Sequence, residues 1–505
     1  MMEPVHDVVV VGKGNAALCA ALAAREQGAS VVMLEAASED ESGGNSRFAG
    51  GVMRFAFSNV EDLKRVTELT DQEIAGSDFG TNTTDEYFDD LFRLTQFRTD
   101  PELSEILVTR SLDTMAWLRG MGVRFVPNYG RQSGTVGGKR RFFGRLPIEV
   151  SGGGAGLVQS LDSAAKRAGI GVFYDTRAVS LIFDADRVAG VRTRQRGRAV
   201  DFRAKAVILA CGGFEANPEM RARYLGPGWD LAKVRGSRFN QGDGLKMALD
   251  IGAAPCGNWS GCHATGWDRN APDFGDVNVG DKFQKHSYIF GLLINAEGKR
   301  FVDEGLDFHS FTYAKYGGEV LKQTGQFAWQ VFDAKVKDLL RNEYRIKFVT
   351  KVVAGSLEEL AGKLDGVNAP AFLKTVHEFN AAVRSDVPFD HTVLDGRGTI
   401  GIEPQKSNWA QALDTPPFEA YQTTCGITFT FGGLRIQAKS GQVLDVHLNP
   451  IPGLFCAGEM VGGIFYFNYA SGTGLVSGAV FGRIAGTGAA RAACEAGNES
   501  SSAIR

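Results

Sequence analysis

The chain has 505 residues, of which 44% are hydrophobic and 22% are charged, and these proportions exclude a disordered or fibrous protein. A formal net charge of −3 excludes the broad basic surface that nucleic-acid binding requires. The length exceeds what one hydrophobic core supports, so we expect two domains. The 64 glycines exceed the usual share of roughly 7%, which indicates many close approaches of the backbone to another group.

The first residues lack the cationic and apolar regions of a secretory signal, and no window approaches ~18 uninterrupted apolar residues. We therefore expect a cytoplasmic protein without a membrane span. The seven cysteines are odd in number and form no C-x-x-C motif, so we expect no disulfide framework, iron–sulfur cluster or c-type haem. No metal site is expected.

Short apolar runs that end in glycine define the expected sheet. The chain opens with a strand at 7–11, a Gly-rich turn, an Ala-rich helix at 16–27 and a strand at 30–34, which together form one βαβ unit. Two further strands, at 206–210 and 453–457, also run into glycine. Open α/β sheets bind ligands at the carboxyl ends of their parallel strands. The sequence therefore predicts an α/β fold whose nucleotide-binding domain uses both ends of the chain.

The middle of the chain has a different character. Residues 257–418 are mixed in composition and end in a Pro-rich stretch, which favours an inserted α+β domain that caps the substrate. The nucleotide-binding domain is then discontinuous and comprises 1–256 and 419–505. The Ser-rich end, 497–505, is expected to be frayed.

The first Gly-rich turn matches the dinucleotide-binding pattern G-x-G-x-x-G/A between a strand and a helix. Gly12 permits the tight turn, Gly14 lets a pyrophosphate approach the helix N-terminus, and Ala17 keeps that helix close to the sheet. Glu35, 21 residues after Gly14, is placed to accept a hydrogen bond from a ribose hydroxyl and disfavours a 2′-phosphate. The neighbouring residues expected at the same nucleotide site are Asn15, Ala16 and Ala36.

A second Gly-rich run, 43–51, begins eight residues after Glu35 and has no role in NAD dehydrogenases. Together with glycines at 212–213 and 458–459 and the N-x-G-D-G motif at 240–244, it carries a family resemblance. The chain resembles the flavoprotein family of fumarate reductases, succinate dehydrogenases and 3-ketosteroid dehydrogenases over nearly its whole length. The resemblance implies a Rossmann-like, glutathione-reductase-like domain that binds FAD.

The resemblance also implies how FAD is held. Membrane-bound members attach FAD through a His in the second Gly-rich run, whereas this chain has Asn45 and Ser46 there. We therefore expect non-covalent FAD. The residues implied for FAD binding, beyond those of the first motif, are Gly43, Gly44, Asn45, Ser46, Gly50, Gly51, Ala178, Cys211, Gly212, Gly213, Asn240, Asp243, Gly458, Glu459, Gly474 and Leu475.

The cationic residues with which fumarate reductases hold a dicarboxylate are mostly replaced in this chain. Phe429 stands where the family has a His, and Tyr469 stands where it has an Arg before the final Gly run. Phe308 occupies the position of the proton-donating Arg, and only one substrate His is matched, by His263. The dicarboxylate clamp is therefore expected to be largely absent.

Aromatic residues take its place in two short segments that the family sets around the flavin ring. They predict an apolar pocket with few polar points, although any one ring can equally belong to the core. Tyr469 suits a neutral ketone oxygen, which a phenol can hydrogen-bond and stabilise as an enolate. Ketosteroid dehydrogenases have a Tyr there, and those acting at the 4,5-bond have a Ser at the position of Ser471. The expected pocket residues are Phe429, Phe431, Phe465, Tyr466, Phe467, Tyr469, Ser471 and Gly472.

A proton acceptor and an anion anchor complete the expected site. His309 is the first candidate for the base, because an unperturbed imidazole pKa of about 6.5 suits proton abstraction at neutral pH. Tyr466 or Tyr313 would need a strongly depressed pKa for this role. His263 or Arg54 is expected to hold a substrate carboxylate.

The motifs as a whole, including those at 312–317 and 465–469, are most similar to those of tricarballylate dehydrogenases, but His309 stands where that subgroup has an Arg. A cyclic keto acid, such as 4-oxocyclohexanecarboxylate, fits both a ketone-binding Tyr and a single carboxylate anchor. The expected reaction removes an α-proton and transfers the β-hydride to flavin N5, which yields a C=C bond beside the carbonyl.

Other functions remain open at this level. They are a polycarboxylate dehydrogenase of the tricarballylate type, a fumarate-type reductase, and a flavin electron-transfer subunit without substrate chemistry. A basic loop at 131–145 is expected to be solvated, or else to steer an anion. The expected partners are a small ketone or keto-acid substrate and an external electron acceptor, which can be oxygen, a quinone or a carrier protein.

Overall fold

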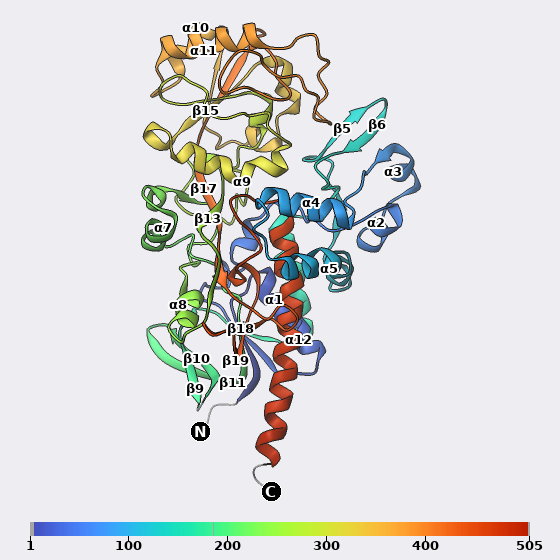
Figure 1. Cartoon of the computed structure of the whole chain (residues 1–505), viewed down its shortest axis with the longest axis vertical. Helices are drawn as coiled ribbons and strands as arrows, with labels where there is room; N and C mark the ends of the chain where they lie inside the picture. Colours follow the sequence, from blue (N-terminus) through green and yellow to red (C-terminus); the bar gives the residue numbers. More distant parts are fainter. Residues whose placement is uncertain (1–4, 185, 503–505) are drawn as a thin grey trace.

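Two sheets, with two long strands running between them, organise the chain (Figure 1). The computed structural model describes residues 5–184 and 186–502. In Figure 1 the first sheet lies in the lower half beside the long helix α12 (Thr473–Ser502), and the second sheet and its helices form the upper part. A group of helices, α2 to α5, lies to one side of the middle.

The first sheet is parallel at its centre, as expected for an α/β fold. Its central strand reads Val8 to Val11, and all four side chains are buried, because helices and loops cover both faces of such a strand. The parallel strands, in spatial order, are β8 (Gly171–Phe173), β2 (Val31–Leu34), β1 (His6–Val11), β11 (Arg198–Leu209) and β19 (Pro450–Cys456), and β18 (Gln442–Leu444) pairs antiparallel with β19 at the edge.

Strand β11 is longer than the apolar run at 206–210 predicts. Its second half, from Ala204, pairs in parallel with β1, whereas its first half, Arg198 to Arg203, pairs antiparallel with β10 (Arg187–Gln195). Strand β10 pairs in turn with β9 (Thr176–Asp184). The polar first half carries no continuous apolar signal because it belongs to this partly exposed meander.

Helices α1 (Asn15–Glu26) and α12 pack closely against each other beside the first sheet. A Cβ at Gly482 or Gly486 would overlap backbone atoms of α1, so the small residues of α12 permit the close approach. Helix α12 extends through Ser502, and residues 503–505 lie outside the described part of the chain, so the expected fraying from 497 stays a prediction.

No helix within the described part of the chain is both long enough and apolar enough to cross a membrane.

The second sheet is built around β17 (Phe418–Leu434). The strands that pair antiparallel with β17 are β13 (Pro255–Asp268), β15 (Ala328–Phe332) and β16 (Lys351–Ala354). Strand β12 (Lys233–Val234) pairs with β17 in parallel. Strand β14 (Leu292–Ile294) pairs antiparallel with β15. Helices α10 (Leu357–Lys363) and α11 (Ala369–Ala382) contribute to a separate hydrophobic core there, which includes Trp329, Phe372 and Phe379.

Strands β13 and β17 run between the two parts of the molecule (Figure 1). The second sheet therefore includes β12, which precedes residue 257, and β17, which begins at the end of the predicted inserted segment. Helix α9 (His309–Leu321) packs on β13 and β17.

The remaining elements flank these sheets. The helices are α2 (Val60–Val66), α3 (Asp71–Gly76), α4 (Thr84–Leu94), α5 (Pro101–Gly120), α6 (Gly153–Arg167), α7 (Pro218–Leu225) and α8 (Asp243–Leu249). The short strands are β3 (Ser77–Asp78), β4 (Phe125–Pro127), β5 (Ser133–Val136), β6 (Lys139–Phe142) and β7 (Ile148–Val150), so the predicted basic loop contains the hairpin β5–β6.

Candidate active site

A large cavity opens where the carboxyl ends of the parallel strands meet the second sheet. Its volume is about 1840 Å³ including its opening to solvent. Pockets for a single drug-sized ligand usually measure ~300–1000 Å³. The cavity therefore has room for a dinucleotide together with a small second molecule.

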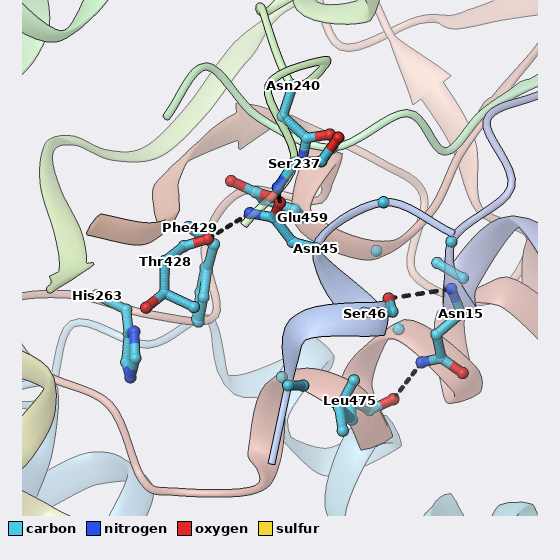
Figure 2. A pocket seen from close by; sticks show the side chains of 18 of the residues that line it. Asn15, Asn45, Ser46, Ser237, Asn240, His263, Thr428, Phe429, Glu459 and Leu475 are labelled. Carbon is cyan, nitrogen blue, oxygen red and sulfur yellow. Dashed lines mark hydrogen bonds between the residues drawn. The ribbon is translucent and has the colours of Figure 1, made fainter. Parts of the chain in front are cut away.

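The turn between β1 and α1 forms one wall of the cavity. Gly12 has a φ of +107°, and a Cβ there would overlap the backbone of Ala210 at the end of β11. Glycine is thus required both by the conformation and by the close approach. The N-termini of α1 and α12 meet at this wall, because the Asn15 side chain donates to the Leu475 carbonyl at 2.7 Å (Figure 2). Two helix N-termini favour a phosphate-bearing ligand.

Glu35 lines the same wall, directly after β2. Its carboxylate accepts a hydrogen bond from the Ala37 amide at 2.8 Å. Burial raises the pKa of Glu35, and hydrogen bonds from backbone amides oppose the rise. An additional hydroxyl donor would favour the carboxylate form, which fits the ribose-binding role that the sequence predicts.

The second Gly-rich run crosses the opening of this nucleotide site as a 3-10 turn, Asn45–Phe48. The Ser46 hydroxyl accepts a hydrogen bond from the Asn15 amide at 3.0 Å (Figure 2). The Asn45 amide group donates to the Thr428 carbonyl at 2.6 Å and accepts from the Ser237 amide at 2.7 Å. Asn45 therefore joins the run to β17 and to the segment that follows β12.

Two buried carboxyl groups lie next to this junction. Glu215 accepts from the Asn45 and Asn240 side chains at 2.5 and 2.6 Å, and Glu459 accepts from the Thr430 amide at 2.7 Å. Burial raises the pKa of both groups, and the negative charge of Glu459 raises the pKa of Glu215 further. Each of the two carboxyl groups therefore influences the titration of the other.

These features fit FAD: a Gly-rich cradle that side chains would fill, two converging helix N-termini and a carboxylate for ribose. Most of the residues that the sequence assigns to FAD line the cavity. Those lining it are Gly12, Gly14, Asn15, Ala16, Glu35, Ala36, Gly44, Asn45, Ser46, Gly50, Gly51, Ala178, Cys211, Gly212, Asn240, Asp243, Gly458, Glu459, Gly474 and Leu475. Gly43 and Gly213 lie behind the wall, where a Cβ would meet side chains of neighbouring residues.

Tyr469 lies at the other end of the cavity among aromatic rings. Its ring packs edge-on against His263, Phe429 and Phe465 at centroid distances of 5.0, 5.3 and 5.2 Å. Its hydroxyl oxygen accepts a hydrogen bond from the Gly474 amide at 2.9 Å. Burial raises the pKa of Tyr469 well above 10, so the phenol keeps its proton at neutral pH. The hydroxyl proton can therefore be donated to a bound molecule.

His263 sits on β13 where the pairing with β17 is irregular, and such bulges commonly re-aim a side chain near a binding site. Its ring stacks on Phe429 at 5.3 Å, as Figure 2 shows. Both ring nitrogens are buried without a hydrogen-bond partner in the structure. Burial and the nearby Arg235 lower the pKa of His263 well below 6.5. A neutral His263 can thus bind a polar ligand group.

His309 begins α9 and lines the cavity, but its surroundings do not suit the role of a base. Its Nε2 accepts a hydrogen bond from Arg341 at 2.5 Å and lies 3.0 Å from the Gln132 amide nitrogen. Burial and the positive charges of Arg341 and Arg131 lower its pKa well below 6.5. The hydrogen bond from Arg341 occupies the Nε2 lone pair, so His309 can remove a substrate proton only after this contact breaks, and its role as the base stays a prediction.

Three other predicted residues do not line the cavity. The Arg54 guanidinium donates to the Ser471 and Gly144 carbonyls at 3.0 and 2.9 Å and lies 3.3 Å from the Asp90 carboxylate. Arg54 is thus a buried structural cation and not a substrate anchor. Phe467 has 46% of its surface exposed, and Tyr466 packs beside it, because the chain turns outward at a φ of +61° there.

The remaining predicted pocket residues are brought together. Phe429, Phe431, Phe465, Tyr469, Ser471, Gly472, His263 and His309 all line the cavity.

The structure adds polar residues that the sequence analysis did not place there: Gln132, Arg235, Gln284, His286 and Arg341. Tyr313, a candidate for the base, and Arg131, from the basic loop, also line the cavity. Arg235 lies shortly before the motif at 240–244, so its position could have marked it. Arg341 lies in an irregular segment without any motif, and only the tertiary structure brings it to the cavity. Arg131, expected in a solvated loop, pairs with Asp281 at 3.0 Å.

A nucleotide cradle at the carboxyl edge of a parallel sheet, with an aromatic chamber beside it, defines a flavoprotein oxidoreductase. The model of a family described as "FAD binding domain" matches residues 7–475, and the chain belongs to this family. The fumarate reductase (cytochrome) of Shewanella frigidimarina is 30% identical to 96% of this chain, over 77% of its own length. The 3-oxosteroid 1-dehydrogenase of Mycobacterium tuberculosis (H37Rv) is 26% identical to 95% of this chain, over 97% of its length.

Solved structures agree with this assignment. The open conformation of a flavocytochrome c3 fumarate reductase has a TM-score of 0.72 and 27% identity, and the alignment covers 97% of this chain and 79% of that chain. The 3-ketosteroid-Δ4-(5α)-dehydrogenase of Rhodococcus jostii RHA1 has the same fold, with a TM-score of 0.69, 24% identity and coverage of 97% and 98%. The protein is an FAD-dependent oxidoreductase that acts on CH–CH groups.

Proposed function

We propose that the protein is a desaturase of small cyclic ketones or keto acids, such as 4-oxocyclohexanecarboxylate, and introduces a C=C bond beside the ketone. The observation that carries this proposal is the Tyr469 hydroxyl. It accepts from the Gly474 amide, keeps its own proton and lies in an aromatic chamber. Such a donor stabilises the negative charge that develops on a ketone oxygen when the α-proton leaves.

The bound FAD, which we propose to be non-covalent, supplies the two-electron acceptor for the reaction. The protein's own residues bind the ketone, exclude water and receive the proton. An external electron acceptor then regenerates the oxidised enzyme.

For the proton acceptor we propose His309 or Tyr313, and Tyr313 lines the cavity between His263 and His286 at ring distances of 4.8 and 4.7 Å. Burial raises the pKa of Tyr313, but Arg235 and a hydrogen bond with Ser471 oppose the rise. Tyr313 must first lose its own proton before it can accept another, whereas His309 is already neutral and must instead leave Arg341.

The test is anaerobic mixing of the holoenzyme with a panel of compounds, monitored by the loss of oxidised-flavin absorbance. The panel contains 4-oxocyclohexanecarboxylate, cyclohexanone, a 3-ketosteroid, tricarballylate and succinate. We expect the keto acid to bleach the flavin fastest and the product to be an enone. Rapid bleaching by tricarballylate or succinate alone would overturn the ketone assignment.

The second candidate, oxidation of a polycarboxylate or the reverse reduction, is favoured by the arginines that line the cavity. The same panel separates the two functions. The third possibility, an electron-transfer subunit, predicts that none of the five compounds bleaches the flavin.

A further inference from the structure

Arg131, Arg235 and Arg341 come from three distant segments and line the cavity together. Arg131 pairs with Asp281 at 3.0 Å and with Glu343 at 3.5 Å. Two carboxylates therefore face Arg131, and its positive charge is compensated within the cluster.

Arg235 is less well satisfied. Its guanidinium lies 3.8 Å from Asp281, a carboxylate that Arg131 already binds, and 3.4 Å from the Thr428 hydroxyl. Only 6% of the residue is exposed, and its buried Nε has no hydrogen-bond partner in the structure. A buried guanidinium with an unused donor is costly unless a ligand completes its contacts.

Arg341 has no carboxylate within 4.0 Å among residues 5–184 and 186–502. It donates to the Arg131 carbonyl at 3.0 Å and to His309 Nε2 at 2.5 Å, and its Nη1 lies 3.5 Å from His286 Nδ1. Burial and Arg131 lower the pKa of Arg341, and the charge of the nearby Glu343 opposes this. The direct hydrogen-bond acceptors of Arg341 are therefore neutral groups.

The two imidazoles are held neutral. His286 Nε2 lies 2.5 Å from the Thr265 hydroxyl, which leaves its Nδ1 lone pair directed at Arg341. Burial and Arg341 lower the pKa of both His286 and His309 well below 6.5. Neither imidazole can add a second positive charge, and neither can neutralise the guanidinium.

The remaining carboxyl groups do not cancel the charge of Arg341. Burial alone would raise the pKa of Asp281, but the positive charges of Arg131 and Arg235 hold this pKa below its usual value. Burial raises the pKa of the nearby Glu149, and the positive charges of Arg131 and Arg341 oppose the rise. Among the described residues, the three guanidinium groups thus share two carboxylates in direct ion pairs, Asp281 and Glu343, and neither of these pairs includes Arg341.

We propose that Arg341 and Arg235 form a carboxylate subsite that orients the substrate in the cavity that Tyr469 also lines. That the other end of the substrate is a ketone rests on the proposed function. The subsite makes the substrate a small anion with its acid group remote from the reacting ketone, and it makes the neutral ketone a poor substrate. Arg54 takes no part in this recognition.

The test uses binding of a compound that cannot be desaturated. Benzoate and its neutral isostere benzamide are titrated into the holoenzyme, with calorimetry and perturbation of the flavin absorption spectrum as readouts. Wild type should bind benzoate about 10- to 150-fold more tightly than benzamide, which corresponds to about 1.5–3 kcal/mol for hydrogen bonds to a charged group. Comparable binding of the two ligands to wild type would overturn the proposal without any variant.

Variants then locate the subsite. Arg341→Met should remove most of the preference for benzoate and leave benzamide binding unchanged, whereas Arg341→Lys should keep part of it. Arg140→Gln, on the hairpin β5–β6 outside the cavity lining, is the matched control for loss of one positive charge and should keep the full preference. If Arg341→Met does not retain FAD, the benzoate preference of Arg341→Lys and Arg235→Lys is measured instead, because both variants keep the charge but lose the planar fork. Both should lose part of the preference, and a full preference in both would overturn the proposal.

The outcomes separate this proposal from the proposed function. Benzoate binding that depends on Arg341, without oxidation of any ketone, would support the subsite and refute the desaturase. Oxidation of cyclic ketones, with an unchanged acid preference in Arg341→Met, would refute the subsite and leave the desaturase standing. A purely structural role for the cluster predicts a lower melting temperature in Arg341→Met with an unchanged acid preference.

Discussion

The substitution Tyr469→Phe removes one hydroxyl and preserves the ring packing that surrounds it. The ring contacts with His263, Phe429 and Phe465 depend on the aromatic face and edge, which phenylalanine retains. The hydroxyl accepts one hydrogen bond, from the Gly474 amide at 2.9 Å, and has a proton to donate. Loss of such a donor typically costs ~10²–10³ in turnover, equivalent to about 2.7–4 kcal/mol of transition-state stabilisation.

The measurement is the rate of anaerobic flavin reduction by saturating 4-oxocyclohexanecarboxylate in wild type and in Tyr469→Phe. Tyr87→Phe is the matched control, because Tyr87 is a fully buried tyrosine outside the cavity lining, with weak contacts of 3.3 and 3.4 Å from its hydroxyl. We expect the control to reduce at nearly the wild-type rate. A reduction rate in Tyr469→Phe within about threefold of wild type would refute the oxyanion role.

Three further predictions concern stability and cofactor retention. Gly12→Ala should abolish FAD binding, measured as flavin per protein, whereas Gly28→Ala, at a similar positive φ but in open space, should cost only about 1–2 kcal/mol. Arg54→Met should lower the free energy of unfolding by about 1–3 kcal/mol, because it leaves two buried carbonyl oxygens without their hydrogen-bond donor. The same variant should keep the benzoate preference. Because the pKa of His286 is lowered in the folded protein, this side chain binds a proton below pH ~6.5 in the unfolded chain but stays neutral in the native state. The free energy of unfolding in urea should therefore fall below pH ~6.5 by about 1.4 kcal/mol per pH unit for that group, and an equal slope in His286→Gln would contradict this.

The cofactor half of the site could be predicted from the sequence because its signals are local. Gly12, Gly14 and Glu35 lie within one βαβ unit, where strand, turn and helix fix their positions relative to one another. The glycines at 212 and 458 follow strands whose carboxyl ends share one sheet edge, so their meeting also follows from the strand pattern. The FAD assignment and the α/β class rest on these segments and are confirmed.

The substrate half could be predicted only in part. The aromatic residues around Tyr469 carry a family pattern and line the cavity, but the sequence gives no sign that Tyr466 and Phe467 turn outward from it. A short segment can alternate between cavity and surface at a single positive-φ residue, and such a turn leaves no periodicity to read.

The ionic contacts were decided by tertiary structure alone. Arg54 and Arg341 are equally plausible anchors in a linear sequence, yet Arg54 is enclosed by Asp90 and backbone carbonyls. Arg341 instead lines the cavity, with no carboxylate within 4.0 Å in the part of the chain that the structure describes. The same holds for His309, whose pKa depends on an arginine 32 residues away in the chain. The sequence by itself determined the fold class and the cofactor, because local motifs encode the turn and strand geometry that binds FAD. Which charges are compensated, and hence which of them can bind a substrate, depends on contacts between distant segments that form only when the two sheets come together.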